Sequence, residues 1–182
     1  MIHVDADKRP SPAAEKRRYL EHRNGATDPG YIKFLRALAD PVCAVVPVGA
    51  RGLDFGCGPA PVLADLLTAG GRPTVGYDPL FQPDVSRLKQ RYDFVTCSEV
   101  VEHAHDPAAT FARIGSLVRA GGTIGIMTQL YDDVPSFGDW WYRRDFTHVC
   151  FYHTDTMRWV AAHYRWTMAV PAPNVVLFTT TR

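Results

Sequence analysis

Short apolar runs alternate with amphipathic stretches along most of the chain, a pattern typical of strands that alternate with helices. Four runs rich in β-branched and aromatic residues each begin after a glycine, a proline or an arginine, as strands do. These predicted strands are residues 52–56, 74–78, 92–100 and 123–130. Two more, residues 165–170 and 174–181, lie close together near the end of the sequence, which predicts an antiparallel hairpin.

Helices are predicted where apolar residues recur at three- and four-residue spacing. They are residues 13–22, 31–40, a segment reaching Leu67, 106–122 and 154–164. We expect Asp106 and Thr154 to cap the last two helices and Pro41 to end the second. Gly70 is expected to close the segment that reaches Leu67.

This order predicts an α/β fold, with helices on both faces of a doubly wound, mostly parallel sheet. In such sheets ligands bind beyond the carboxyl ends of the strands. The chain has 182 residues, which suits one domain over residues 1–182. We divide it into an N-terminal helical arm or lid, residues 1–50, and an α/β core, residues 51–182.

Composition and charge exclude several classes. Hydrophobic residues make up 46% and charged residues 21%, as in ordinary globular proteins, and the net charge is only +1. That balance gives no support to a nucleic-acid or membrane partner. The four cysteines form no C-x-x-C pair, and we find neither a long apolar span nor an apolar leader. We therefore expect a cytoplasmic protein with reduced thiols.

A glycine turn follows the first predicted strand, in the segment LDFGCGPAP, residues 53–61. Gly56 and Gly58 allow backbone conformations closed to other residues and bring the main chain close to a ligand. A dinucleotide fingerprint needs a third glycine at Pro61. Asp54 would also repel a phosphate, whereas it suits an amine or a cation.

Asp78 ends the next predicted strand, 20 residues after Gly58. A carboxylate at that place accepts hydrogen bonds from both ribose hydroxyls of a nucleotide or nucleoside. Together with Asp54, it indicates a nucleoside with a cationic or amino-bearing tail and no phosphate. S-adenosyl-L-methionine has that chemistry.

With these motifs in place, the chain from about Gly52 onward resembles the class I S-adenosylmethionine-dependent methyltransferases. It is most similar to a small branch with a D-x-T-H-V segment after the fifth strand, here residues 145–149. The resemblance implies a Rossmann-like sheet of about six to seven strands. Only 13 residues separate Asp78 from Tyr92, so the third strand must be shortened or missing.

The resemblance also implies which residues contact the cofactor. The leading helix is implied to close over the site, and Pro79 and Leu80 to pack on the base. The implied cofactor residues are Asp54, Phe55, Gly56, Cys57, Gly58, Asp78, Pro79, Ser98, Glu99, Tyr19 and His22.

Two carboxylates and an imidazole follow the strand over residues 92–100. Glu99, Glu102 and His103 are spaced so that one helical turn places them on one side, and His148 is a candidate fourth ligand from a separate loop. This set suits a divalent cation such as Mg²⁺ or Mn²⁺. The spacing resembles metal-dependent O-methyltransferases of ubiquinone biosynthesis and of small RNA. The alternative is that Glu102 and His103 only order a loop.

Without a metal, His103 or His148 is a candidate general base, because imidazole titrates near neutral pH. Asp145, three residues before His148, is expected to hold that ring's tautomer if both lie on one helical turn. A purely structural role for these histidines stays open.

Eight of the chain's 21 aromatic residues fall within residues 131–152, after the strand over residues 123–130. This aromatic insert is placed where a substrate wall belongs. It would suit a ring-shaped acceptor, or a nucleobase helped by Arg143 and Arg144. The alternative is that these rings fill the core.

The sequence thus predicts a methyltransferase that uses S-adenosyl-L-methionine, with a small-molecule acceptor favoured. It fixes neither the acceptor, nor the atom methylated, nor the oligomeric state. Two alternatives stay open: a nucleotide-dependent oxidoreductase on a similar fold, and a module that binds the cofactor without catalysis.

Overall fold

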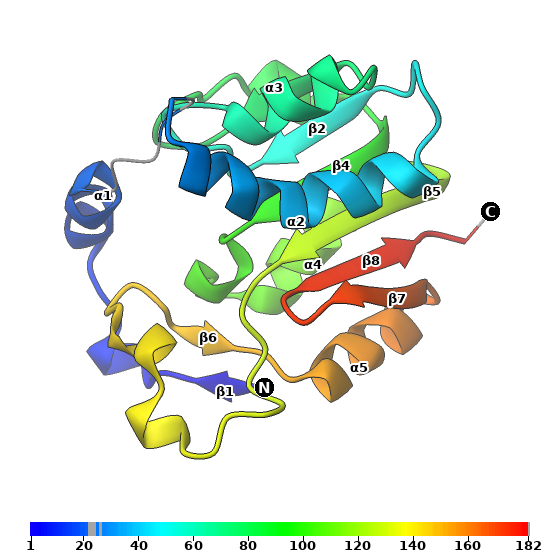
Figure 1. The fold of residues 1–182 in the computed structure, drawn as a ribbon. Coiled ribbons are helices and arrows are strands. Elements are labelled where there is room, and N and C mark those ends of the chain that lie inside the picture. Colours follow the sequence, from blue (N-terminus) through cyan, green and yellow to red (C-terminus); the bar gives the residue numbers. More distant parts are fainter. Residues whose placement is uncertain (22–24, 26, 182) are drawn as a thin grey trace.

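A six-stranded sheet forms the centre of the molecule (Figure 1). The computed structural model describes residues 1–21, 25 and 27–181 of the chain. In sheet order the strands are β3 (Thr74–Tyr77), β2 (Gly52–Phe55), β4 (Tyr92–Ser98), β5 (Val118–Met127), β8 (Val175–Thr179) and β7 (Thr167–Ala172). β3, β2, β4 and β5 run parallel, and β8 pairs antiparallel with β5 and β7. The predicted mostly parallel sheet with a hairpin edge is confirmed.

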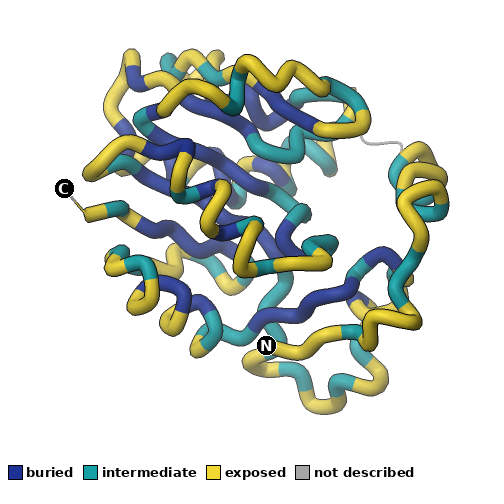
Figure 2. Tube along the Cα trace, turned by 180° about the vertical axis from the view of Figure 1, so that it is seen from behind, coloured by how far each residue is buried: buried dark blue, intermediate teal, exposed yellow. Residues whose placement is uncertain are grey.

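Helices cover both faces of this sheet. They are α2 (Pro29–Val45) and α3 (Val62–Ala69) on one face, and α4 (Pro107–Ser116) and α5 (Thr154–Tyr164) on the other. Leu38 and Leu67 belong to the apolar cluster under the first pair, and Ile114 and Met157 to the cluster under the second. Figure 2 shows the central strands buried and the outer turns of the helices exposed.

The third strand of a seven-stranded sheet is missing, as the short interval after Asp78 predicts. A 3₁₀ helix, η2 (Val85–Lys89), stands in its place between β3 and β4. The Arg87 guanidinium donates a hydrogen bond to the carbonyl of Gly76 in β3. The free edge of β3 is therefore partly capped by a side chain.

The first helix lies apart from the sheet, beside the carboxyl ends of the parallel strands (Figure 1). This is α1 (Pro12–Glu21); the 3₁₀ helix η1 (Ala6–Lys8) precedes it. The strand β1 (Ile2–His3) pairs antiparallel with β6 (Cys150–Phe151). The start of the chain is thus tied to the aromatic insert.

The expected arm over residues 1–50 includes a helix that packs in the core. Leu35, Leu38 and Val42 of α2 are buried against the sheet and α3. The prediction that Pro41 ends this helix is wrong, because the helix continues to Val45. The burial of its apolar side explains why. The apolar contacts of the last turn offset the hydrogen bond that proline cannot donate.

Two other predicted boundaries are wrong. The helix predicted over residues 106–122 ends at Ser116, because Val118 pairs with Tyr92 and so begins β5 before a bulge. Thr154 does not cap α5: the Nδ1 atom of His153 accepts from the backbone N–H of Asp155 at 3.1 Å. Within the described residues, no helix is long and apolar enough to cross a membrane.

Candidate active site

The glycine turn between β2 and α3 wraps around the end of β3. Gly56 and Gly58 have φ angles of 81° and 67°, the left-handed region in which glycine is not strained. The backbone N–H groups of Gly56 and Cys57 donate to the carbonyl of Tyr77 at 2.7 and 3.1 Å. The N–H of Gly58 donates to Asp78 Oδ2 at 3.1 Å. Three successive donors of the turn are therefore bonded within the protein.

The start of α3 is correspondingly poor in donors for an anion. Pro59 and Pro61 have no N–H at all. A pyrophosphate needs free N–H groups at such a helix start. The turn as built does not suit a dinucleotide.

Asp78 is buried at the carboxyl end of β3 and organises the chain around it. Its Oδ1 accepts from the N–H groups of Leu80 and Phe81 at 2.8 and 3.0 Å. The residues that follow, Pro79 and Leu80, are exposed beside it. This arrangement fixes the carboxylate in one orientation next to the glycine turn.

Asp54 lies in β2 beside this carboxylate and is also buried. Burial, with repulsion from Asp78, raises the pKa of Asp54 to about 7, although a hydrogen bond of 2.9 Å from the Thr96 hydroxyl opposes the shift. Tyr31 lies on the first turn of α2, near enough to be influenced by the charge of Asp54. Burial, and then the negative charges of Asp54 and Glu99, raise the pKa of Tyr31 to about 12. Tyr31 belongs to the segment DPGY, which the resemblance places in the leading helix over the site, but it is not among the implied cofactor residues because only the packing of α2 brings its ring here.

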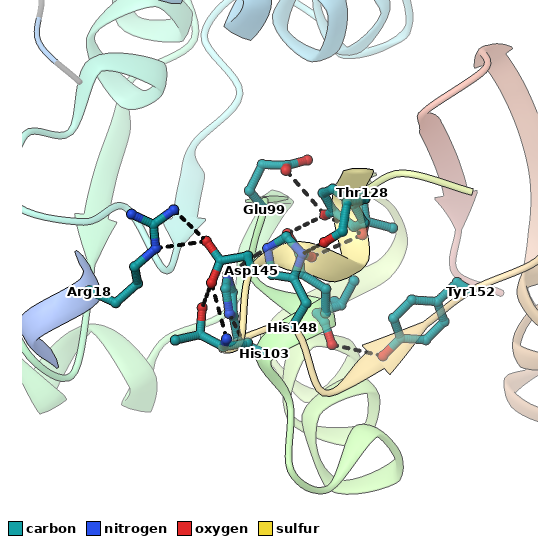
Figure 3. Close-up of polar contacts among 11 residues, drawn as sticks. Arg18, Glu99, His103, Thr128, Asp145, His148 and Tyr152 are labelled. Atoms are coloured by element: carbon teal, nitrogen blue, oxygen red, sulfur yellow. Dashed lines mark hydrogen bonds and ion pairs between the residues drawn. The ribbon is translucent and has the colours of Figure 1, made fainter. Parts of the chain in front are cut away.

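The second part of the site follows β4 (Figure 3). Glu99 has a φ of 51°, a strained conformation for a residue other than glycine. The 3₁₀ helix η3 (Val101–His103) comes next and holds Glu102, which is fully buried. Glu99 and Glu102 are joined by Tyr142, from the 3₁₀ helix η5 (Trp141–Arg144) of the aromatic insert. The Tyr142 phenol oxygen lies 3.1 Å from Glu99 Oε2 and 2.7 Å from Glu102 Oε1.

The contacts of Tyr142 with Glu99 and Glu102 need more protons than the phenol alone supplies. The Thr128 hydroxyl donates to Glu102 Oε2 at 2.9 Å, and the single phenol proton of Tyr142 can serve only one carboxylate. The Glu99–Tyr142 contact then needs a proton on Glu99, or a cation nearby. Burial first, and then the charge of Glu102, raise the pKa of Glu99 to about 9. Burial likewise raises the pKa of Glu102.

Both predicted histidines of the site lie next to this pair, with ring centroids 4.8 Å apart. The Nδ1 atom of His103 is 2.9 Å from the carbonyl oxygen of Thr147, and that of His148 is 2.7 Å from the carbonyl oxygen of Tyr142. A carbonyl only accepts, so in the neutral ring Nδ1 carries the proton and Nε2 the lone pair. Burial lowers the pKa of His148, which favours that neutral form.

Glu102, His103 and His148 each offer a ligand atom, and these atoms lie within 4.8 Å of one another. Three of the four predicted metal ligands are thus brought together. Glu99 stands beside the group and is linked to it through Tyr142.

Asp145 does not hold His148 as predicted, because the Tyr142 carbonyl is bonded to Nδ1 of that ring. The Asp145 carboxylate instead accepts from the Thr147 hydroxyl at 2.6 Å and pairs with Arg18 of α1 at 2.8 Å. These donors hold the pKa of Asp145 well below its usual range, even though burial alone acts in the opposite direction. Asp145 therefore links α1 to the aromatic insert (Figure 3).

The remaining predicted cofactor residues, apart from His22, lie within the part of the chain that the structure describes. Tyr19 of α1 lies half-buried, with its ring 5.2 Å from that of His103. Phe55 packs on Tyr77 at 5.7 Å, and Ser98 ends β4. His22 lies outside the described residues.

Comparison with known proteins gives this geometry a context. A family profile described as "Methyltransferase domain" matches residues 19–168, most of the chain. The chain belongs to this methyltransferase-domain family. The oxidoreductase alternative is thereby set aside, and the class expected from the glycine turn is confirmed.

Curated relatives of this methyltransferase domain match a shorter stretch. The ubiquinone biosynthesis O-methyltransferase of Aeromonas salmonicida is 32% identical in an alignment 103 residues long, and the match covers 44% of this chain and 43% of that protein. The protein of the same name from Salmonella arizonae is 31% identical in an alignment 104 residues long, and the match covers 44% of this chain and 43% of the relative. The match therefore spans less than half the length of these relatives.

Solved structures share the fold of the domain at low identity. Magnesium protoporphyrin IX methyltransferase from Synechocystis PCC 6803, solved with S-adenosylhomocysteine, has a TM-score of 0.62 at 15% identity, covering 84% of each chain. The 1,6-didemethyltoxoflavin-N1-methyltransferase of Burkholderia thailandensis has a TM-score of 0.59 at 15% identity, covering 99% of this chain and 94% of its own. Both likenesses support the Rossmann-like methyltransferase fold.

Proposed function

We propose that the protein transfers a methyl group from S-adenosyl-L-methionine to a hydroxyl oxygen of a small-molecule acceptor. Its family supports methyl transfer, and the curated relatives named above are O-methyltransferases. An oxygen acceptor also suits the histidines beside Glu102. A neutral histidine can accept the proton of an acceptor hydroxyl, and histidines can bind a cation that lowers the pKa of that hydroxyl.

The bonding of the glycine turn is the observation that carries the cofactor assignment. The N–H groups of residues 56–58 are used inside the protein, the Asp78 carboxylate is bonded to the turn, and Asp54 lies buried in the strand that leads into it. This arrangement excludes a phosphate and favours an amine and a ribose. Glu99 Oε1 is buried with no hydrogen-bond partner among the described residues, so a polar ligand group is needed there.

The position of each residue around the glycine turn suggests which part of the cofactor it binds. Asp78 binds the ribose hydroxyls and Asp54 the methionine amine, while Tyr19 and Tyr31 close the site from α1 and α2. Methyl transfer is an in-line displacement at the cofactor's sulfonium, so the chain contributes alignment and removal of the acceptor's proton. Where no cation is bound, His148, whose neutral ring has its lone pair on Nε2, is placed to accept that proton.

We also propose that Glu102, His103 and His148 hold a divalent cation such as Mg²⁺ or Mn²⁺. Their donor atoms are close enough to share one ion, and both ring Nδ1–H groups are fixed on backbone carbonyls, as in known metal-ligating histidines. Two buried carboxylates with raised pKa values would be neutralised by such an ion. When bound, the ion would lower the pKa of an acceptor hydroxyl.

The transfer is tested with methyl-labelled S-adenosylmethionine and a panel of hydroxylated aromatic acceptors. We expect label in an ether product, with release of S-adenosylhomocysteine. Cofactor binding without turnover on any acceptor would favour the non-catalytic module instead.

The metal is tested separately from the transfer. Exhaustive chelation should abolish turnover, and added Mg²⁺ or Mn²⁺ should restore it. His103→Ala should weaken Mn²⁺ binding, measured by electron paramagnetic resonance, whereas His163→Ala on the outer face of α5 should not. Full turnover after chelation contradicts the metal and leaves His148 as the base.

A further inference from the structure

A cavity of about 490 Å³ opens from the Glu99–His148 centre toward the aromatic insert. Tyr142 and His148 lie at its polar end, and Trp141, Arg144 and Phe146 complete the wall from the insert. The volume is that of a typical small-molecule pocket. The cavity is therefore where an acceptor hydroxyl would reach His148.

The cavity wall holds two arginines with different surroundings. Arg18 is already neutralised, since it pairs with Asp145 at 2.8 Å and Glu21 at 3.2 Å. Arg144 lines the same cavity but forms no hydrogen bond or ion pair with any described residue. Arg144 is thus the guanidinium in this wall that stays available for an anion.

Two large apolar rings flank this available guanidinium in the sequence and line the cavity with it. Trp141 is 62% exposed and Phe146 is 55% exposed, which is unusual for such rings in a folded domain. Trp141 contacts Tyr142 with 5.3 Å between ring centroids but stays largely exposed, whereas most other rings of the insert are packed more deeply, for example Phe151 against Phe137 at 5.1 Å. Exposed rings beside a cavity offer a stacking surface for a flat ligand.

We propose that the acceptor is a hydroxylated aromatic carboxylate. Its hydroxyl enters toward His148, its ring contacts Trp141 and Phe146, and its carboxylate pairs with Arg144. The proposal rests on the methyl-transfer function above and adds the class of the substrate.

A nucleotide has a ring and an anionic group as well, yet the charges favour the smaller ligand. A nucleic-acid strand is held by several phosphate contacts at once, and this chain has a net charge of only +1. Arg18 pairs with both Glu21 and Asp145, so these three groups leave a net charge of −1 beside the cavity, which disfavours a polyanion. One free guanidinium matches one carboxylate.

The test measures binding to the protein saturated with S-adenosylhomocysteine, by calorimetry. The probes are dihydroxybenzoate and the longer dihydroxycinnamate, each paired with its neutral amide. The variants are Arg144→Gln and, as a matched control, Arg143→Gln. Arg143 is the adjacent arginine, but it lies outside the cavity wall, donates to the carbonyl of Gly138 and packs over the Phe137 ring.

We expect at least one acid to bind about tenfold more tightly than its amide, the usual effect of a charge-assisted hydrogen bond. Arg144→Gln should remove this preference, and Arg143→Gln should keep it. Equal affinities of acid and amide, no binding of either acid, or a preference unaffected by Arg144→Gln overturns the proposal. Tighter binding of a short single-stranded RNA through Arg144 overturns it in favour of a nucleotide.

Titrating S-adenosylhomocysteine into the ligand-free protein, and each acid into the protein without it, separates this proposal from the one on which it rests. If S-adenosylhomocysteine does not bind while the acid still discriminates, the methyl-transfer function fails and the carboxylate site stands.

Discussion

The Tyr142 phenol oxygen lies 2.7 Å from Oε1 of the fully buried Glu102. The same oxygen is 3.1 Å from Glu99 Oε2, and the carbonyl of the same residue is bonded to the His148 ring. One residue of the aromatic insert thus touches both carboxylates and orients one histidine. The insert builds the polar centre as well as the cavity wall.

Replacing Tyr142 with Phe keeps the packed ring and removes the phenol. The unfolding free energy should fall by about 1–3 kcal/mol, because Glu102 loses a donor and stays buried. The second-order rate constant for methyl transfer should fall at least about tenfold. Urea unfolding and steady-state kinetics measure the two effects.

Tyr131→Phe is the matched control for that variant. Tyr131 belongs to the same insert, and its hydroxyl forms no hydrogen bond with the described residues. We expect a change within about 0.5 kcal/mol, as for ordinary surface substitutions. Equal losses in the two variants would contradict the role given to Tyr142.

Asp54 should make the stability of the ligand-free protein depend on pH. Its pKa is raised to about 7 in the folded state by burial, whereas an unfolded aspartate titrates near ~4. The folded state therefore keeps a proton that the unfolded state loses. The stabilisation is complete below about pH 4 and is lost as the pH rises to about 7, by at most ~1.4 kcal/mol per pH unit.

Asp54→Asn has no such proton, so its unfolding free energy should decline less over this pH range. Chemical denaturation of both proteins between pH 4 and 8 measures the difference, and parallel curves would contradict the shift. The cofactor's amine favours ionised Asp54, so affinity for S-adenosylmethionine should rise with pH toward 7 in the wild type.

The two glycines of the cofactor turn should respond differently to alanine. Both have positive φ angles, which cost a residue with a Cβ about 1–2 kcal/mol. At Gly56 the added Cβ would also lie 2.4 Å from Cγ2 of Val100, whereas at Gly58 it meets no atom within 4 Å. Gly56→Ala should therefore lower the melting temperature clearly more than Gly58→Ala, and the reverse order would refute the packing of the turn.

Much of this site could be predicted because its residues are close in sequence to a strand end. Asp54, Gly56 and Gly58 follow one apolar run, and Asp78 ends the next. In a parallel sheet the carboxyl ends of neighbouring strands meet, so the pattern alone brings these residues together.

The polar centre could not be predicted in the same way. Tyr142 lies 40 residues after Glu102, in 3₁₀ turns without periodicity, and only the packing of the insert brings the two together. Likewise, the histidine tautomers depend on the backbone carbonyls of Tyr142 and Thr147, which no side-chain pattern reveals. For that reason the sequence suggested the Asp145 carboxylate as the partner of His148, whereas the partner is the backbone carbonyl of Tyr142.

The central claim is that the turn and its two aspartates bind a nucleoside without phosphates. The most direct measurement is calorimetric titration of the ligand-free protein with S-adenosylhomocysteine, with NAD⁺ titrated in parallel. We predict saturable one-to-one binding of S-adenosylhomocysteine that Asp78→Ala abolishes, and no binding of NAD⁺. Absence of S-adenosylhomocysteine binding to the folded wild-type protein, or tighter binding of NAD⁺, would contradict the account.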